Sequence, residues 1–166
     1  RMPIDTYKSQ KRGGKGITGI ATREEDFVKQ IFTCSTHDTI LFFSNKGKVY
    51  RLRGYEIPEA GRTAKGTAIV NLLMLDGGEK ISAVIPIANF AEGKYLLMAT
   101  KNGIIKKTSL NEYMSVRKSG LIGITLKEED ELIDVRLTDG EDNVVLVTHK
   151  GMCITFDEKD VRPMGR

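Results

Sequence analysis

The chain has 166 residues, of which 40% are hydrophobic and 29% charged, with a formal net charge of +4; this composition is typical of a soluble globular protein built as one domain or a few small repeats. No apolar run approaches the roughly 18 residues that a membrane span needs, and the opening RMPIDTYKSQ lacks the apolar centre of a signal peptide, so we expect a cytoplasmic protein without a membrane partner. Cys34 and Cys153 lie far apart in apolar contexts, which favours buried thiols over a disulfide.

The first prominent stretch is QKRGGKG, which spans Gln10 to Gly16. Glycines without side chains let backbone N–H groups and neighbouring cations approach a polyanion closely. Weaker copies follow at RTAKG, residues 62–66, and at RKSG, residues 117–120. We name these stretches box 1, box 2 and box 3. Residues 1–70 hold 13 Lys and Arg against 7 Asp and Glu, whereas residues 71–166 hold 13 against 15, so an anionic partner would meet the N-terminal part first.

Three segments downstream share one pattern. TILFFSNKGKVYRL (39–52), YLLMATKNGIIKKT (95–108) and NVVLVTHKGMCITF (143–156) each place an apolar run before a Ser or Thr, a Gly three residues later, and a second alternating run. This pattern predicts β-hairpins, with Asn102-Gly103 as a type I′ tip. The repeat predicts units at about residues 1–38, 39–93, 94–142 and 143–166, in an array that continues beyond this chain.

Each box precedes a second pair of predicted strands, separated by an acidic turn that we expect to be solvated. The pairs are 17–21 with 27–34, 68–75 with 81–87, and 121–126 with 132–137. Four strands about every 50 residues predict an all-β, propeller-like array of four-stranded blades, about two and a half to three blades in all. Helix should be slight, with a single turn after Ser109 capped by Ser109 and Glu112.

Basic residues gather in the boxes and on the outgoing arms of the hairpins. In a radial array these positions share one rim, so the sequence predicts a discontinuous basic band that would face an anionic partner. The residues of this band, which the resemblance described below implies to be DNA-binding, are Gln10, Lys11, Arg12, Gly13, Gly14, Lys15, Gly16, Lys48, Arg51, Arg53, Arg62, Lys65, Lys106, Lys107, Arg117 and Lys118.

Other chemistries have weaker support. Gly14 to Gly19 matches GxGxxG, but it follows a polar stretch instead of a strand, which disfavours nucleotide binding. His37 and His149 have no Cys, Asp or Glu at ligand spacing and are expected to be turn residues, so we predict no metal site. No nucleophile motif surrounds any serine. We predict no catalytic residue and no cofactor in this chain.

Box 1, with Tyr7 before it and REEDF (23–27) after it, resembles a signature box of bacterial DNA gyrase. That box lies in the C-terminal DNA-wrapping domain of the A subunit, which is one of the two kinds of chain in gyrase. The resemblance continues in order along the chain, through THD (36–38), FFSNKGKVY (42–50), IVNLL (69–73), MATKNGIIKKT (98–108), DELI (130–133) and VRPMGR (161–166). It implies a β-pinwheel of six blades that exchange strands with their neighbours, of which this chain would hold part.

The resemblance also implies a mechanism. DNA would wrap in a positive sense along the outer rim, with little sequence preference, and box 1 would lock the wrap; the wrap supports ATP-dependent negative supercoiling by a type II topoisomerase. The implied partners are double-stranded DNA, the rest of the gyrase A protein, and the gyrase B protein, in an A2B2 holoenzyme. ATP and Mg²⁺ would bind elsewhere in that holoenzyme.

Two alternatives remain open. The A-type protein of topoisomerase IV shares the blade but has a degenerate box, which the intact QKRGGKG disfavours. A propeller that serves as a protein-interaction platform would show no salt-dependent DNA binding and would present an apolar or acidic working face.

Overall fold

The structure is a computed structural model that describes residues 1–22 and 25–166. Its strands are β1 (Thr39–Ser44), β2 (Lys48–Arg53), β3 (Ile81–Ile87), β4 (Tyr95–Thr100), β5 (Ile105–Ser109), β6 (Leu121–Ile122), β7 (Leu132–Thr138), β8 (Asn143–Val147) and β9 (Cys153–Asp157). Short 3₁₀ turns separate them: η1 (Ile4–Thr6), η2 (Gly54–Glu56), η3 (Ile69–Asn71), η4 (Leu110–Tyr113) and η5 (Glu158–Asp160). Within the described part of the chain, no helix is long and apolar enough to cross a bilayer.

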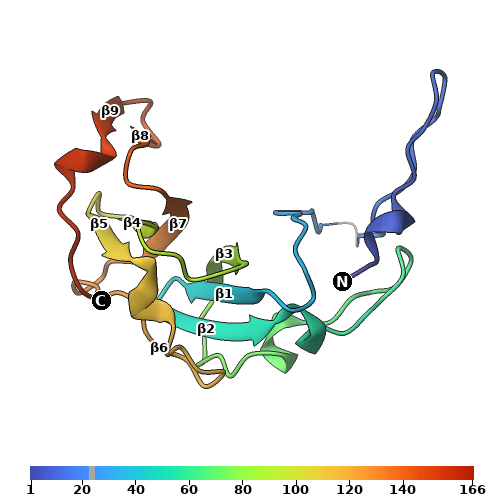
Figure 1. The fold of residues 1–166 in the computed structure, drawn as a ribbon, viewed down its shortest axis with the longest axis horizontal. Helices are drawn as coiled ribbons and strands as arrows, with labels where there is room; N and C mark the ends of the chain where they lie inside the picture. The colour runs from blue at the N-terminus through green and yellow to red at the C-terminus, as the bar shows by residue number, and fades with distance from the viewer. Residues whose placement is uncertain (23–24) are drawn as a thin grey trace.

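The strands form three antiparallel sheets along a curved arc (Figure 1). Their orders are β3-β1-β2-β6, β5-β4-β7 and β8-β9. Strands β3 and β7 lie on the concave side of the arc, whereas β2 and β5 lie on its convex side. Strand β6 follows the second hairpin but pairs with β2 of the first, Lys48 opposite Ile122 and Val49 opposite Leu121. Neighbouring repeats therefore exchange strands.

Each hairpin closes through the same hydrogen bonds, which explains the repeated Ser/Thr-x-x-Gly pattern. The N–H of Gly47, Gly103 or Gly151 donates to the carbonyl of Ser44, Thr100 or Thr148, at 2.9–3.0 Å. The Ser or Thr hydroxyl oxygen accepts a second bond from the N–H four residues on. The glycines have φ from 75° to 82°, and Asn102 is not among the positive-φ residues of the described chain. The type I′ prediction for Asn102-Gly103 is therefore wrong: the geometry matches a three-residue loop that ends in a left-handed glycine.

The first sheet is covered on both faces at β1, because all six residues of this strand are buried and successive side chains point to opposite faces. One face joins the second sheet in a core of 14 buried residues that includes Leu41, Phe43, Met98 and Tyr113. The other face, with Ile40, Phe42, Tyr50 and Leu52, is covered by Leu73. Burying a side chain of this size contributes about 1.5–3 kcal/mol, so the two hairpin sheets form one packed body.

Three of the predicted strands are absent, and a fourth, at 121–126, is shortened to β6 (Leu121–Ile122). The described residues of 17–21 and 27–34 lie outside any strand, and Phe27 and Ile31 are more than 70% exposed. In the next repeat, β6 pairs with the preceding hairpin and β7 with the hairpin of its own repeat. Segments 17–21 and 27–34 would need a hairpin of the same kind, and residues 1–16 form none. Residues 68–75 contain η3 (Ile69–Asn71) and pack across the face of β1 and β2, because β2 already pairs with β6 at its outer edge. Arg23 and Glu24 of the REEDF stretch lie outside the described residues.

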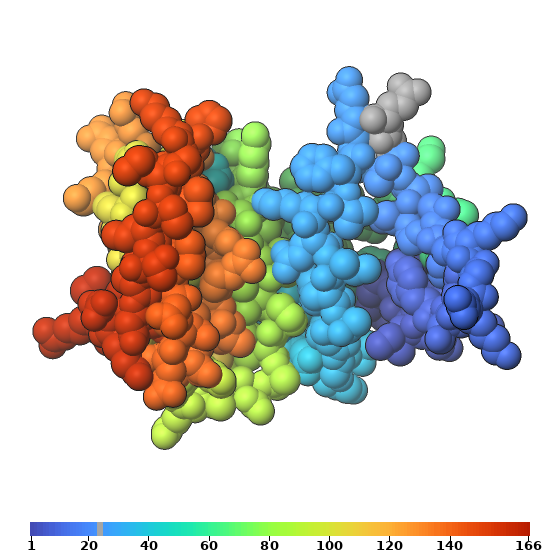
Figure 2. Space-filling model, turned by 90° about the horizontal axis from the view of Figure 1, so that it is seen from above, coloured from blue at the N-terminus to red at the C-terminus, as the bar shows by residue number. Residues whose placement is uncertain are grey.

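Two smaller predictions also fail. Turn η4 follows Ser109 as predicted, but Ser109 makes no side-chain capping hydrogen bond. Cys34 and Cys153 are free thiols, as predicted, but both are exposed. Cys153 lies on β9, which belongs to a two-stranded sheet and is exposed at four of its five residues. In the space-filling view, the third repeat (orange to red) and the N-terminal segment (blue) stand on either side of the green β3 region (Figure 2).

Candidate nucleic-acid interface

Box 1 forms an exposed loop that one of its own side chains braces. The Gly16 N–H donates to Gln10 Oε1 at 2.8 Å, and the Gly14 N–H donates to the Lys11 carbonyl at 3.0 Å. A Cβ on Gly14 would meet Gln10 Oε1 and would displace the folded glutamine side chain. The cations Lys11, Arg12 and Lys15 are exposed, and no described carboxylate forms an ion pair with them.

The base of box 1 is tied to box 2. The Tyr7 hydroxyl donates to the Gly19 carbonyl at 3.2 Å across the foot of the loop. Arg62 of box 2 donates through Nη1 to the Thr18 carbonyl at 3.3 Å, and its own carbonyl accepts from the Ala21 N–H at 3.2 Å. Lys65 remains exposed. The two boxes therefore lie at one end of the arc, where the box 1 loop rises from the body (Figure 1).

Box 3 is docked against the first hairpin. Gly120 has φ +81°, and a Cβ there would lie 2.5 Å from the Tyr50 ring. The backbone at the end of box 3 therefore packs directly against that ring. Strand β6 then joins β2, and the N–H groups of Gly123 and Ile124 donate to the Gly47 carbonyl at 2.8 and 3.0 Å. Arg117 and Lys118 remain exposed, with Lys118 Nζ 3.6 Å from Glu56 Oε1. All three boxes end in a positive-φ glycine: Gly16, Gly66 and Gly120.

The predicted cations of the hairpins lie on the convex strands β2 and β5, where most are half-buried. Lys48 forms a 2.5 Å ion pair with Asp76, whose pKa the Lys48 ammonium lowers. Arg51 and Arg53 donate to the carbonyls of Met114 and His37, at 3.2 and 3.0 Å. Burial lowers the pKa of Lys106. Lys48, Arg51 and Arg53 are therefore held by contacts within the protein. All four cations reach the surface only in part.

Lys107 departs from the predicted pattern, because its side chain is only 4% exposed. Its Nζ lies 3.3 Å from Glu158 Oε1, donates to the Glu158 carbonyl at 3.2 Å, and stands 4.6 Å from the centre of the Tyr95 ring. A buried cation held in this way offers no donor to a phosphate at the surface. Alternation along β5 is the cause, since Lys106 and Lys107 point to opposite faces of the sheet.

Two turn acids are buried where the sequence predicted solvated loops. Asp130 Oδ1 accepts from the N–H groups of Asn102 and Glu131 at 3.0 and 2.9 Å. Glu79 Oε2 accepts from the Tyr50 hydroxyl and the Asp76 N–H, both at 2.8 Å. Each acid lies two residues before a concave-side strand, β3 or β7, and the repeated position was the signal that could have identified it. Both hold a turn together, so the acidic turns are not merely solvated.

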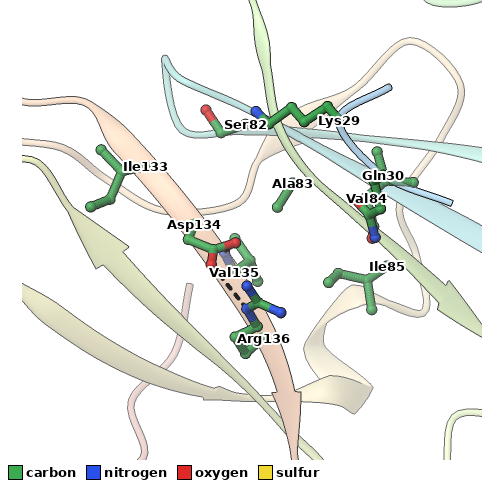
Figure 3. Close-up of a pocket in the computed structure, with 10 residues that line it drawn as sticks. All are labelled: Lys29, Gln30, Ser82, Ala83, Val84, Ile85, Ile133, Asp134, Val135 and Arg136. Carbon is green, nitrogen blue, oxygen red and sulfur yellow. Dashed lines mark hydrogen bonds and ion pairs between the residues drawn. The ribbon is translucent and has the colours of Figure 1, made fainter. Parts of the chain in front are cut away.

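A hollow of about 420 Å³ lies between the edge strands β3 and β7 (Figure 3). Figure 3 shows the Arg136 and Asp134 side chains paired there, with Arg136 Nε 2.9 Å from Asp134 Oδ2. Gln30 crosses from the N-terminal segment to donate to the Val84 carbonyl at 3.2 Å. The lining includes Ser82, whose hydroxyl donates to the Leu132 carbonyl at 2.7 Å. The basic rim remains the best candidate site.

Hairpin sheets that follow one another around an arc and exchange strands define a protein of the β-propeller class. The family model described as DNA gyrase C-terminal domain, beta-propeller, matches residues 1–35, 38–88, 94–139 and 142–166. The chain therefore belongs to the DNA gyrase A C-terminal domain family.

Named relatives agree with this assignment. The chain is 58% identical to the DNA gyrase A protein of Clostridium acetobutylicum over all of its 166 residues, which are 20% of that relative. A crystal structure of the C-terminal domain of DNA topoisomerase IV matches with a TM-score of 0.80 and 37% identity, covering 89% of this chain and 46% of that one. A DNA gyrase A C-terminal domain matches with a TM-score of 0.70 and 27% identity, covering 98% and 52%. The chain thus spans about a fifth of the length of its curated gyrase relative.

Proposed function

We propose that the chain binds duplex DNA without sequence preference and wraps it in a positive sense along the convex rim. The observation that carries this proposal is box 1: three exposed cations on a braced, glycine-rich loop, without a carboxylate partner among the described residues. Contacts between such cations and phosphates position the protein on the duplex and do not read bases. The proposed contact set keeps box 1, box 2, box 3 and the cations Lys48, Arg51, Arg53 and Lys106, and it leaves out Lys107.

The curvature of the arc supports wrapping over straight binding. The convex rim runs from box 1 past β2 to β5, so DNA that follows successive cations has to bend (Figure 1). Bending 20–30 base pairs by 40–90° costs on the order of 1–6 kcal/mol. Several phosphate contacts would offset that cost, and releasing counterions would favour each one.

In the whole protein, we propose that the wrap presents a second segment of the same DNA for strand passage. The chain would then serve the gyrase A protein within a cytoplasmic A2B2 gyrase that lowers linking number with ATP. DNA cleavage, ATP hydrolysis and Mg²⁺ binding would belong to other parts of that assembly. This chain would set the path of the DNA and would carry out no catalytic step. Loss of box 1 should reduce supercoiling while leaving DNA cleavage intact.

A topoisomerase IV role is the second candidate, because a topoisomerase IV C-terminal domain matches the chain with a TM-score of 0.80. The 58% identity to a gyrase A protein over the full chain and the complete box 1 favour gyrase. The gyrase and topoisomerase IV roles can be distinguished by experiment, since a gyrase domain should require box 1 to wrap DNA.

The salt dependence of DNA affinity tests the proposal. Binding to a mixed-sequence duplex of roughly 40 base pairs would be measured at several salt concentrations for the wild type and for Lys11→Ala/Arg12→Ala/Lys15→Ala. Each lost phosphate contact lowers the log–log slope by about 0.9. We expect the triple variant to lose about 2–3 units of slope.

The matched control is Lys29→Ala/Lys80→Ala/Lys127→Ala, because these three cations are also exposed but lie in the hollow or in the acidic turns. Both triple variants lower the formal net charge from +4 to +1. The control should keep the wild-type slope to within one unit. Equal losses in the two variants would mean that net charge alone drives binding, and absence of wild-type binding at low salt would refute the proposal.

A further inference from the structure

The ion pair between Lys107 and Glu158 is the most deeply buried charged contact that the structure describes. Lys107 is 4% exposed and Glu158 is fully buried. Glu158 uses both carboxylate oxygens: the Thr138 hydroxyl donates to Oε1 at 2.5 Å and the Asp142 N–H donates to Oε2 at 3.2 Å. The Lys107 ammonium in turn contacts Oε1, the Glu158 carbonyl and the Tyr95 ring. Such a satisfied network fixes the groups that share it.

The two residues belong to different repeats. Lys107 is on β5, in the second sheet, whereas Glu158 begins η5, directly after β9 of the third. The backbone of Lys107 also holds the C-terminal segment, because its carbonyl accepts from the Met164 N–H at 2.8 Å and it forms a parallel bridge with Pro163. A single residue therefore binds the third repeat through both its side chain and its main chain.

Apolar packing does not provide a second anchor of the kind that joins the first two sheets. The buried core between those sheets contains 14 residues, and neither buried cluster includes a residue beyond Val135 in the described chain. On the two-stranded sheet β8–β9, Val145, Val147 and Ile154 are more than half exposed. The junction of the third repeat is therefore mainly polar.

We infer that the Lys107–Glu158 pair is the joint that fixes the orientation of the third repeat against the second, and that Lys107 positions the DNA path without contacting DNA. The consequence for DNA rests on the proposed function, whereas the joint itself does not. Removing one partner of a buried pair leaves the other charge uncompensated, so the joint should open.

Distance measurements between spin labels on the two repeats test the joint directly. One label would occupy native Cys153 on β9 and the other Asn102→Cys at the tip of the second hairpin, with Cys34→Ser to remove the remaining thiol; Asn102 is exposed. We expect a narrow distance distribution in the parent protein, at least a twofold broader one with Lys107→Met, and a narrow one again with Lys107→Arg, which keeps the charge.

A control label pair reports on the apolar junction. Lys46→Cys and Asn102→Cys, with Cys34→Ser and Cys153→Ser, join the tips of the first and second hairpins. This distribution should stay narrow with Lys107→Met. If both label pairs broaden, the ion pair supports the whole fold and is not a joint; if neither broadens, the joint is refuted.

The salt slope for DNA separates positioning from phosphate contact. A positioning residue should leave the slope of Lys107→Met within about half a unit of the wild type, whereas a phosphate ligand would lower it by about 0.9. The distance distributions do not involve DNA, so failure of the proposed function would leave that test of the joint intact. A slope reduced by a full unit, with an unchanged distance distribution, would overturn the inference.

Discussion

Box 1 and box 3 are copies of one sequence pattern with different structural roles. Both end in a left-handed glycine. An added Cβ on Gly16 would have no described atom within 4 Å, whereas one on Gly120 would meet the Tyr50 ring. After box 3 the chain pairs with β2, whereas the residues after box 1 join no described strand. The difference shows that a box packs against the fold when the segment after it pairs as a strand, and that it forms an exposed loop when that segment is unpaired.

The largest expected effect comes from the box glycines. Gly120→Ala places a Cβ 2.5 Å from the Tyr50 ring at a positive φ, so strain and overpacking together should lower the free energy of unfolding by about 3 kcal/mol or more. Gly16→Ala carries only the backbone strain and should lower it by about 1 kcal/mol. Urea unfolding of both variants checks the comparison, and equal losses would mean that box 3 is not docked as described.

Acid should loosen box 3 more than box 1, because Tyr50 donates to Glu79. Burial alone would raise the pKa of Glu79, but bonds from Ser44, the Asp76 N–H and the Tyr50 hydroxyl hold that pKa below its ordinary value of 4.5. Because the pKa of Glu79 is lower in the folded state than in the unfolded chain, its ionised carboxylate stabilises the fold above pH 4.5. This stabilisation is lost as the pH falls through the lowered pKa. Unfolding midpoints from pH 6 to pH 3 should therefore fall less steeply in Glu79→Gln than in the wild type; parallel curves would contradict the assignment.

The smallest expected effect is on DNA affinity. Arg117→Ala/Lys118→Ala removes two exposed cations from the docked box, and Lys118 already shares its charge with Glu56. The salt slope should fall by about 1 unit, against about 2–3 units for the box 1 triple variant. A loss in box 3 as large as that in box 1 would mean that docking does not change how a box meets DNA.

The hairpins could be predicted from the sequence because every determinant is local. Alternation sets the strands, and the Ser/Thr-x-x-Gly pattern supplies the turn glycine and the hydroxyl acceptor within five residues. Strands β3 and β7 were also predicted, because each apolar run begins just after an acidic turn. Segment 68–75 has an equally apolar run but forms η3 across a sheet face, since the β2 edge belongs to β6.

The site was predictable only in part. Residue type and repeat position identified the basic boxes, but they could not show that Lys106 reaches the rim while Lys107 turns inward to Glu158. That distinction depends on which face of β5 packs against the following repeat, and no local pattern encodes it. Glu79 and Asp130 are likewise held by partners that are distant in sequence. The partner of Glu79 is Tyr50 on β2, and that of Asp130 is Asn102 at a hairpin tip.

The most direct test of wrapping is a linking-number measurement. Relaxed closed-circular DNA would be incubated with increasing amounts of the chain, the free supercoils removed by a nicking–closing topoisomerase, and the protein then stripped away before gel analysis. The account predicts a positive change in linking number that grows with wild-type protein and is absent in Lys11→Ala/Arg12→Ala/Lys15→Ala. Tight binding by the wild type with no linking-number change, or with a negative one, would contradict positive wrapping along the convex rim.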